Sequence, residues 1–542
     1  MQLFGKDRKI IIVLFLITFS IGILYALYTD HRWEDWYITY RASKNLAMGN
    51  GLTFTVGERV YSYTSPINTL LPALFAAVFQ SNPDEYAIWL YRLVNCLILG
   101  LCSVLLYRLG QQLKWNKMIA YLVIALFSVD ILIVDNSING METPYMMLFL
   151  IILITQLLKG NEASVKGLIL AFAGLMYTRP DGFIYAFFLV VGVLLFYFDF
   201  KNYRAQFPLL KKIARASLIG ILIYLPWILI TWYYYGDPIP NTIHAKSVAK
   251  SYDALHVISE FVNFPLSLFS RTNTTCLLSG LFMPGYAVFF EKWYNLELAG
   301  RIISTLAFCG FFLPLIPRSG RAISFSIYMI VFYLTALSGQ GGMPWYLPNV
   351  SIQVIIFLGI FLNALYTRFR TPIVLGVGYL FLAWTIVILL FGSYHLKTQQ
   401  RIVEYGNRKK IGTWLHTQAQ GRRETVFMEC LGYMGYFSQL KTYDFPGMSS
   451  PEVVAVLKEG KKTGDVTYSR VIDKLRPDWV VLRPWEVKNV QQQMPGLLEN
   501  NYYEAKKFSV LDQIPSQWYL MGKTYLEFDA EFIVFRKSKR SE

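Results

Sequence analysis

Long apolar runs separated by short polar segments dominate the first 395 positions of the chain. A run of about 17–25 apolar residues can cross the hydrocarbon core of a bilayer as a helix. By this measure the pattern predicts a polytopic α-helical membrane protein with about eleven transmembrane helices. The spans are expected near residues 10–28, 86–110, 118–135, 143–158, 165–178, 182–200, 216–234, 297–317, 322–338, 349–366 and 372–394.

The basic residues give these spans an orientation, because Lys and Arg are enriched in cytoplasmic loops. The apolar stretch 66–80 is short for a span and is typical of a helix at the membrane interface. If it is not counted as a span and the N-terminus is inside, every basic loop cluster falls on the cytoplasmic side. These clusters lie at 114–117, 159–166, 201–215, 318–321 and 368–370.

The pattern changes at about residue 396, where charges become frequent and long apolar runs stop. Runs typical of β-strands, at 425–428, 479–482 and 532–535, alternate with helical stretches such as 451–459 and 468–475. We therefore predict two domains. Residues 1–395 form a transmembrane domain with a first outer loop at 29–85 that carries juxtamembrane helices, and residues 396–542 form a soluble α/β domain on the outer side.

Composition agrees with the membrane prediction, because 54% of the residues are hydrophobic and only 16% are charged, against about 25% charged in soluble domains. The net charge of +16 is explained by cations that flank the cytoplasmic ends of spans, so we expect no nucleic-acid partner. The five cysteines are scattered, with no CxxC pair, and this argues against a zinc site or a disulfide framework.

The most informative segment is the first outer loop, which begins with Glu34 and Asp35 directly after the first span. On a helical wheel Asp35 shares a face with Ile38 and should point into protein, whereas Glu34 lies beside Arg41. A carboxylate directed into a protein pocket is costly unless it is paired or used. Two roles for Asp35 stay open: a catalytic group, or a helix N-terminal acid that binds free N–H groups.

The same wheel places Trp33, Trp36, Tyr37 and Tyr40 on one stripe. Amphipathic aromatic rings are favoured in the headgroup layer of a membrane. We therefore expect this stripe to anchor the loop at the membrane surface, and we expect Glu34 to pair with Arg41.

Other polar groups fall on the outer side of the predicted spans. Arg179 and Asp181 lie in a tight TRPDG turn, and a Gly-rich loop runs from 339 to 348. Arg and Lys can neutralise phosphate, a carboxylate can take a proton, and aromatic rings can hold a lipid or a sugar. The remaining candidates are Tyr63, Thr64, Glu142, Asp237, Asn241, His244, Lys246, Trp345 and Tyr346.

Several of these segments resemble one family. RASKNLAMGNGLTFTVGERVYSYTSP, GMET, TRPDG, YYGDPIPNTIHAKS, GYFSQLKTYDFPGMSSPEVV and LRPDWVVLRP, in this order, are similar to segments of GT-C class polytopic glycosyltransferases that use polyprenyl-phosphate sugars. The closest resemblance is to bacterial cell-wall and pilin-modifying arabinofuranosyltransferases. Family members often show two aspartates in the first loop, where this chain has Glu34 and Asp35.

The resemblance implies an inverting single displacement in which Asp35 is the base, with Glu34 as the second catalytic candidate. It implies that the donor phosphate is met by residues among Arg179, Lys246, His244 and Arg41. The residues expected to bind the substrates are Glu142, Asp181, Asn241, Tyr63, Thr64, Trp345 and Tyr346. A divalent cation is not required by a phosphodiester donor, but Asp35 and Glu142 could supply oxygen ligands for one.

The resemblance also implies a location in the bacterial inner (cytoplasmic) membrane, with the site and the C-terminal domain extracytoplasmic. The partners are then a polyprenyl-phosphate sugar donor, a glycan or protein acceptor such as pilin, and the lipid bilayer. Arabinofuranose is the expected sugar. A lipid-linked sugar flippase is the main alternative, although a transporter is expected to carry inverted repeats and charges at the membrane midplane.

Overall fold

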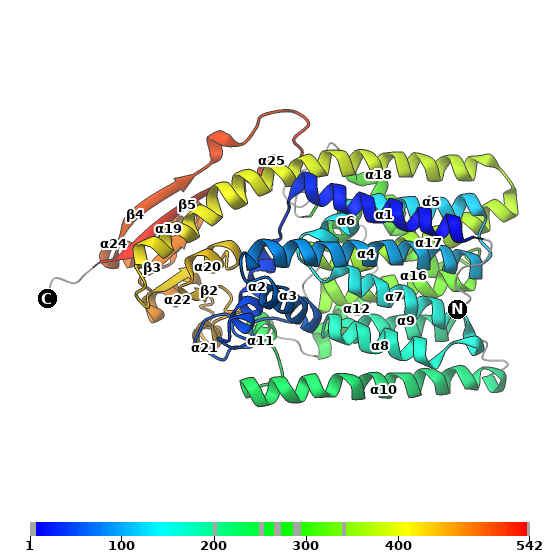
Figure 1. The fold of residues 1–542 in the computed structure, drawn as a ribbon, viewed down its shortest axis with the longest axis horizontal. Helices are drawn as coiled ribbons and strands as arrows, with labels where there is room; N and C mark the ends of the chain where they lie inside the picture. The colour runs from blue at the N-terminus through cyan, green and yellow to red at the C-terminus, as the bar shows by residue number, and fades with distance from the viewer. Residues whose placement is uncertain are drawn as a thin grey trace.

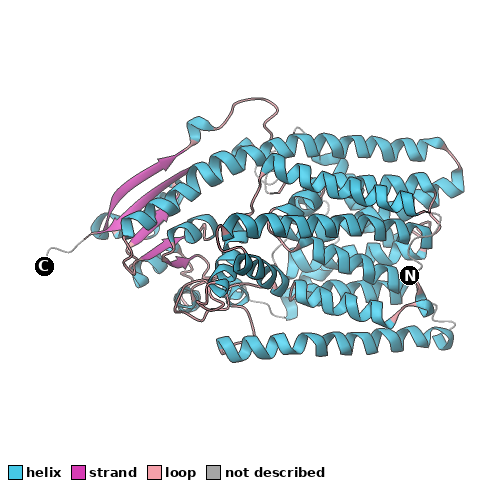
Figure 2. Cartoon of the chain, in the orientation of Figure 1, coloured by secondary structure: helices cyan, strands magenta, loops and turns pink. Residues whose placement is uncertain are grey.

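The structure is a computed structural model that describes residues 7–198, 203–248, 254–264, 273–285, 293, 295–338 and 343–538. A bundle of roughly parallel helices fills one end of the molecule, and a small sheet with its own helices fills the other (Figures 1 and 2). Helix α1 begins at the end of the bundle far from the sheet (Figure 1).

The first half of the chain is helical in the described residues. Its helices are α1 (Arg8–Thr29), α2 (Glu34–Ala47), α3 (Pro66–Val78), α4 (Pro83–Gln112), α5 (Lys117–Val129), α6 (Ile131–Ile138), α7 (Thr143–Leu157), η1 (Gly160–Glu162), α8 (Val165–Thr178), α9 (Gly182–Phe196), α10 (Tyr203–Tyr235), α11 (Asn241–Val248) and α12 (Ala254–Asn263).

The bundle continues with α13 (Asn273–Gly280), α15 (Glu297–Cys309), η4 (Gly310–Phe312), α16 (Arg318–Phe332), η5 (Tyr333–Leu337), η6 (Pro344–Tyr346), α17 (Leu347–Phe369) and α18 (Pro372–Thr398). The C-terminal region has helices η7 (Gln399–Arg408), α19 (Lys409–Ala419), α20 (Gly432–Ser438), α21 (Pro451–Lys461), α22 (Tyr468–Leu475), α23 (Pro484–Gln493), α24 (Leu497–Asn501), η8 (Leu511–Gln513) and α25 (Lys523–Phe528). Its strands are β1 (Thr425–Met428), β2 (Lys441–Asp444), β3 (Trp479–Leu482), β4 (Tyr502–Ser509) and β5 (Glu531–Lys537).

The chain is a multi-pass membrane protein, but the eleven spans are not confirmed as a count. In the described residues, six helices are long and apolar enough to cross a membrane, or seven if α5 and α6, bent by 49° at their junction, form one broken span. Three of the expected spans correspond to shorter apolar helices, α7, α8 and α9, of 14 or 15 residues. The expected interfacial helix at 66–80 is α3, also a short apolar helix.

The basic loops gather at one end of the bundle. Near the N-terminus, Gln111 donates a hydrogen bond to Asp7 at 2.6 Å. At the neighbouring turn, the backbone N–H of Asn116 donates to Asn363 at 2.8 Å. Lys212 likewise donates to the carbonyl of Asn161. These bonds join loops and helix ends from different parts of the chain, and the side of the membrane that they face stays a prediction.

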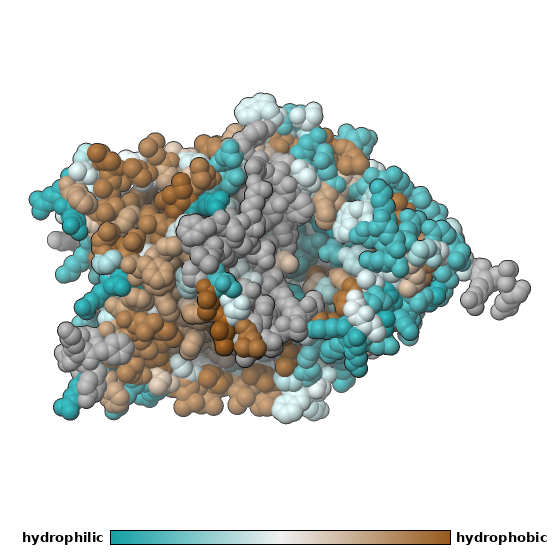
Figure 3. Space-filling model, turned by 180° about the vertical axis from the view of Figure 1, so that it is seen from behind, coloured by the Kyte–Doolittle hydropathy of each residue, from teal (hydrophilic) through white to brown (hydrophobic). Residues whose placement is uncertain are grey.

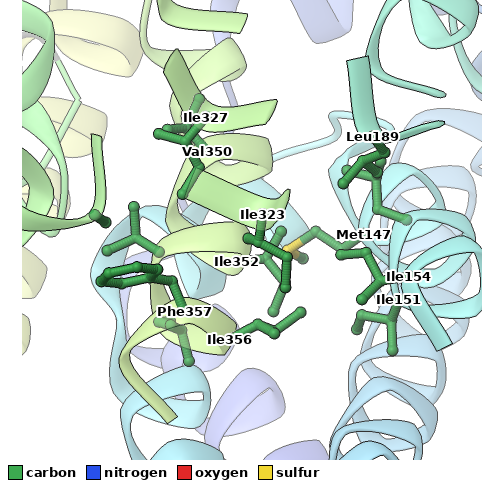
Figure 4. Packing of buried hydrophobic residues seen from close by; sticks show 14 of the residues in the cluster. Met147, Ile151, Ile154, Leu189, Ile323, Ile327, Val350, Ile352, Ile356 and Phe357 are labelled. Carbon is green, nitrogen blue, oxygen red and sulfur yellow. The ribbon is translucent and has the colours of Figure 1, made fainter. Parts of the chain in front are cut away.

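The bundle core is made by branched and thioether side chains from helices distant in sequence (Figure 4). Met147 and Ile151 of α7 pack with Leu189 of α9, Ile323 of α16 and Ile352 of α17, all fully buried. Such close packing fixes the relative positions of these helices. This packing also keeps the ends of the helices in fixed positions, and these ends carry the residues of the site described below.

One unbroken helical run, Pro372–Ala419, joins the bundle to the sheet by way of α18, η7 and α19. The sheet has the order β2-β1-β3-β5-β4, with β1 parallel to β2 and β3, and β5 antiparallel to β3 and β4. The α/β character predicted for this region is confirmed, and all three predicted strands are present. The domain boundary at 396 stays a prediction, because the helix crosses it without a break.

The surface divides in the same way as the fold. Seen from behind, apolar residues cover the bundle and polar residues cover the sheet end (Figure 3). An apolar belt of this kind suits a lipid environment, and the polar cap suits water.

Candidate active site

Helix α2 carries the two predicted carboxylates and lies where the bundle meets the C-terminal domain (Figure 1). Its aromatic stripe does not anchor it in a headgroup layer. Trp36, Tyr37 and Tyr40 are at most 2% exposed, and they pack against Tyr91, Tyr433 and Tyr436. The expectation of an interfacial anchor was wrong, because α20 of the C-terminal domain covers this face of the helix.

Asp35 is on the other face of α2, as the helical wheel predicts. It is half-buried and lines a cavity of about 270 Å³ between the ends of the bundle helices that lie nearest the sheet. The predicted candidates that share this cavity with it are Tyr63, Thr64, Glu142, Arg179, Asp181, Lys246, Trp345 and Tyr346. These residues come from five separate stretches of sequence and meet because the ends of their helices are neighbours.

Arg179 is held in one orientation at the end of α8. Its guanidinium donates from Nη1 to Glu142 at 2.7 Å and from Nε to Asp181 at 2.9 Å, and it lies over the ring of Tyr346 at 4.6 Å. In the described part of the chain, Nη2 makes no hydrogen bond. The arrangement leaves one guanidinium N–H group free for an anion.

Helix α3 adds polar atoms to the same cavity. The Ser65 side chain caps α3 by accepting the N–H of Asn68, with Pro66 in the first turn. The Asn68 side chain donates to Glu142 at 3.1 Å. Four buried oxygens of cavity residues have no partner within the described residues, namely Ser62 Oγ, Asn68 Oδ1, Asp181 Oδ2 and Thr242 Oγ1. Buried polar atoms are normally satisfied, so these unmet groups indicate a polar ligand.

Asp35 is unusual among the buried acids, because within the described residues it has no hydrogen bond or ion pair. The alternative role for Asp35 was to accept hydrogen bonds from the free N–H groups at the start of its helix. No such hydrogen bond is present among the described residues. Burial raises the pKa of Asp35 to about 6; Lys246 and Arg179 oppose the rise, and Glu142 adds to it. A carboxylate with a pKa near neutrality can both take and release a proton under working conditions.

Four predicted candidates, Arg41, Asp237, Asn241 and His244, line neither this cavity nor the one that Glu34 faces. Arg41 donates to the carbonyls of Gly435 and Leu440, and Glu34 pairs with Arg408 instead, so the predicted pair of Glu34 with Arg41 was wrong. The predicted contact of Arg41 with the donor phosphate stays a prediction. His244 pairs with Asp237 at 2.9 Å. Asn241 donates to the carbonyls of Gly447 and Met448.

Glu34 faces a second cavity of about 340 Å³ toward the C-terminal domain. It pairs with Arg408 at 3.1 Å and accepts the N–H of Gly432 at 3.1 Å. Burial raises the pKa of Glu34 to about 8, although Arg408 opposes the rise. Since Glu34 is engaged by an arginine, it is a weaker candidate for a base than Asp35.

The described residues do not suit a metal ion. Among them, no three His, Cys, Asp or Glu side chains gather so as to hold one. Both oxygens of Glu142, the expected partner of Asp35 in a cation site, are already taken by Arg179 and Asn68. No step of the reaction is therefore assigned to a cation.

The Gly-rich part of the predicted loop, residues 339–342, lies outside the described residues.

Sequence reasoning missed Ser62, Asn68 and Thr242 in the first cavity and His31, Arg408 and Arg483 in the second. Ser62 and Asn68 flank the predicted Tyr63 and Thr64, so the polar exit of the first outer loop was a usable signal. Nothing local to His31 distinguishes it, because the partner of its ring, Asp135, is more than 100 residues away. Arg408 has one local partner, Glu404, but its contacts with Glu34 and Asp529 span more than 100 residues.

Comparison with known proteins places the fold. ArnT from Cupriavidus metallidurans, solved bound to undecaprenyl phosphate, matches over 98% of both chains with a TM-score of 0.50 and 11% identity. Archaeoglobus fulgidus oligosaccharyltransferase (92% of this chain, 72% of that chain, 12% identity) and the mycobacterial arabinofuranosyltransferase AftD (99% and 40%, 12% identity) each give 0.46. The resemblance to GT-C glycosyltransferases is thus confirmed at the level of the fold.

Two further comparisons add less. Residues 394–535 match a family described as a domain of unknown function, DUF8728. No curated protein matches the chain.

Proposed function

We propose that this chain is a membrane glycosyltransferase that moves a sugar from a polyprenyl-phosphate donor to a hydroxyl group of an acceptor. The observation that carries the proposal is Asp35, a carboxylate with no partner among the described residues, beside the cationic groups Arg179 and Lys246 in one cavity. A base next to an anion-binding pair is what displacement of a phosphate by an alcohol needs. The likeness to a structure bound to undecaprenyl phosphate supports the donor class.

In the proposed step the acceptor hydroxyl oxygen attacks the anomeric carbon while its proton passes to Asp35. The bond from the anomeric carbon to the phosphate oxygen breaks, and polyprenyl phosphate leaves with the electron pair. Arg179, through its free Nη2, and Lys246 meet the charge that develops on that oxygen. Because attack is from the face opposite the leaving group, the configuration inverts.

The finer assignments come from the family resemblance. The sugar is arabinofuranose, and the acceptor is an envelope glycan or a surface protein such as pilin. The cavity and the C-terminal domain face the outside of the bacterial inner membrane. Incubation of the purified protein with radiolabelled polyprenyl-phosphate sugars tests the proposal: label in an acceptor supports it, and label carried across vesicles without transfer would instead identify a flippase.

Replacement of Arg179 by Lys is expected to weaken binding of undecaprenyl phosphate about tenfold to a hundredfold. The charge is kept, but the planar fork that bonds Glu142, Asp181 and a phosphate at once is lost, and a charged hydrogen bond is worth about 1.5–3 kcal/mol. Equilibrium binding of the lipid to detergent-purified protein measures the change. The control is Arg321→Lys at the opposite end of the bundle, and equal affinities for both variants would remove Arg179 from the donor site.

Transfer is expected to depend on pH with an inflection near 6. Asp35 acts as a base only when ionised, and burial raises its pKa to about 6. The rate at low substrate concentration should therefore rise tenfold for each pH unit below 6 and level off above it. A rate that is flat between pH 5 and 8 would show that the group taking the proton is not Asp35.

A further inference from the structure

The two cavities meet at Asp35. Lys246, Trp345, Ile38 and Met448 also line both of them. The first cavity is bounded by the ends of bundle helices, whereas the second is bounded largely by the C-terminal domain, through residues such as Glu429 and Asp529. A base between two adjoining cavities can serve a donor held in one and an acceptor held in the other.

A buried histidine lines the second cavity at the loop between α1 and α2. His31 is fully buried, and its Nδ1 lies 2.7 Å from Asp135 of α6. Asp135 also accepts bonds from Tyr25 at 3.4 Å and from Asn139 at 3.2 Å. The Asp135 oxygens accept all of these bonds, so Nδ1 of the imidazole is the donor in its contact with Asp135. Asp135 thereby fixes the orientation and the tautomer of the ring.

The other ring nitrogen has no partner. His31 Nε2 is buried and makes no hydrogen bond within the described residues. In an imidazole that donates from Nδ1, Nε2 is the nitrogen with a lone pair that can accept a hydrogen bond. A buried acceptor without a donor is costly, so a hydroxyl group of a ligand in this cavity would relieve a penalty that the protein otherwise bears.

The rest of the lining indicates the class of ligand. Aromatic faces are supplied by Trp33, Phe445 and Phe528. The charged groups are largely neutralised by one another, since Arg408 pairs with Asp529 at 2.6 Å and Arg483 pairs with Glu429 at 2.9 Å. Apolar rings beside mutually paired charges suit an uncharged molecule with many hydroxyl groups. The volume of about 340 Å³ is at the small end of ligand pockets, which run from about 300 to 1,000 Å³.

We propose that the second cavity is the acceptor site, that its ligand is the end of a neutral saccharide chain, and that His31 Nε2 accepts a hydrogen bond from a hydroxyl group of that sugar. Asp135 is a positioning residue in this arrangement, because it acts through His31. This rests on the proposed transferase function and adds to it the class of the acceptor and the residues that bind it.

The test uses His31→Asn in the full-length, detergent-purified protein. The Asn amide retains a donor for Asp135 and removes Nε2. The probes are labelled polyprenyl-phosphate sugar as donor and, as acceptors, neutral trisaccharides of arabinose, galactose, glucose and mannose, and one Ser/Thr peptide. We expect the wild type to glycosylate at least one trisaccharide. In His31→Asn the acceptor KM should rise about tenfold, with donor KM and donor hydrolysis by water unchanged.

Asp135→Asn is expected to raise the acceptor KM in the same way, and His416→Asn serves as the control. Within the described residues, the ring of His416 bonds the carbonyl of Ser438 at 3.1 Å and no other group, and it lines neither cavity. Transfer to the peptide alone, or an unchanged acceptor KM in a folded His31→Asn protein, would overturn the acceptor site and leave the transferase function standing. A wild type that neither hydrolyses the donor nor transfers its sugar would overturn both.

Discussion

Asp35→Asn is expected to lower the rate of sugar transfer by a factor of about 10²–10⁴, the usual contribution of a general base. The amide keeps the size and polarity of the side chain but cannot take the proton of the acceptor hydroxyl. Binding of undecaprenyl phosphate should persist, since Arg179 and Lys246 remain in the cavity. Initial rates with a labelled donor, together with equilibrium binding of the lipid, measure the two effects separately.

The same variant should be no less stable than the wild type. Burial raises the folded-state pKa of Asp35 to about 6, above the usual aspartate value of about 3.9. The folded protein therefore binds the proton more tightly than the unfolded chain, and stability falls as the pH rises from about 4 to 6 and stays low above it. An amide escapes this loss, so the apparent Tm at pH 7 should be equal or higher.

Asp237→Asn is the matched control, because Asp237 pairs with His244 and lines neither cavity. It should transfer sugar at the wild-type rate. Near-normal turnover of Asp35→Asn would show that another group takes the proton. Lost turnover together with a lower Tm would indicate that the carboxylate supports the fold.

The sequence predicted the position of Asp35 because the evidence is local. The apolar run that ends near residue 28 sets where the chain leaves the bundle, and the period of 3.6 residues sets which way Asp35 points. The same wheel failed for Tyr37 and Tyr40, since it reports which residues share a face and not what covers that face. Tyr37 and Tyr40 are covered by Tyr433 and Tyr436 of α20, which lie nearly 400 residues further along the chain.

The error over Glu34 and Arg41 has the same origin. Residues seven apart on a helix lie on one face, so pairing was a reasonable local expectation. The C-terminal domain offers each a better partner: Arg408 for the carboxylate and the carbonyls of Gly435 and Leu440 for the guanidinium. Burial of both groups is possible only because these partners come with the domain that excludes water.

Arg408 is the centre of the contact between the bundle and the C-terminal domain. Its guanidinium lies 3.1 Å from Glu34 of α2, 2.9 Å from Glu404 of η7 and 2.6 Å from Asp529 after α25. Asp529 in turn bonds Arg483 at 2.7 Å. Burial would raise the pKa of Asp529, but Arg408 and Arg483 hold it below its usual value. The cluster thus depends on two arginines that balance several acids.

Replacement of Arg408 by Met is expected to cost about 3–5 kcal/mol of stability, the usual effect of removing one partner from a buried ion pair. The side chain keeps most of its volume, so the loss is electrostatic: Glu34 and Glu404 would be buried without their cation. The difference in apparent Tm between variant and wild type should be large at pH 8 and smaller at pH 5, because burial raises the pKa of Glu34 to about 8 and this carboxyl group is protonated at the lower pH. Thermal unfolding of detergent-purified protein, followed by tryptophan fluorescence, measures it.

Arg422→Met provides the comparison, because Arg422 is 56% exposed and pairs with Glu424 at 3.1 Å. Glu424 is only 10% exposed, but it keeps its pair with Arg536 at 2.8 Å. The contact with the exposed arginine contributes about 0–1 kcal/mol, so the Tm of this variant should hardly move. In the double variant Arg408→Met with Glu34→Gln, part of the lost stability should return, since one uncompensated charge has been removed. If Arg408→Met unfolds at the wild-type temperature at pH 8, the cluster does not hold the two domains together, and packing of α2 against α20 must do so instead.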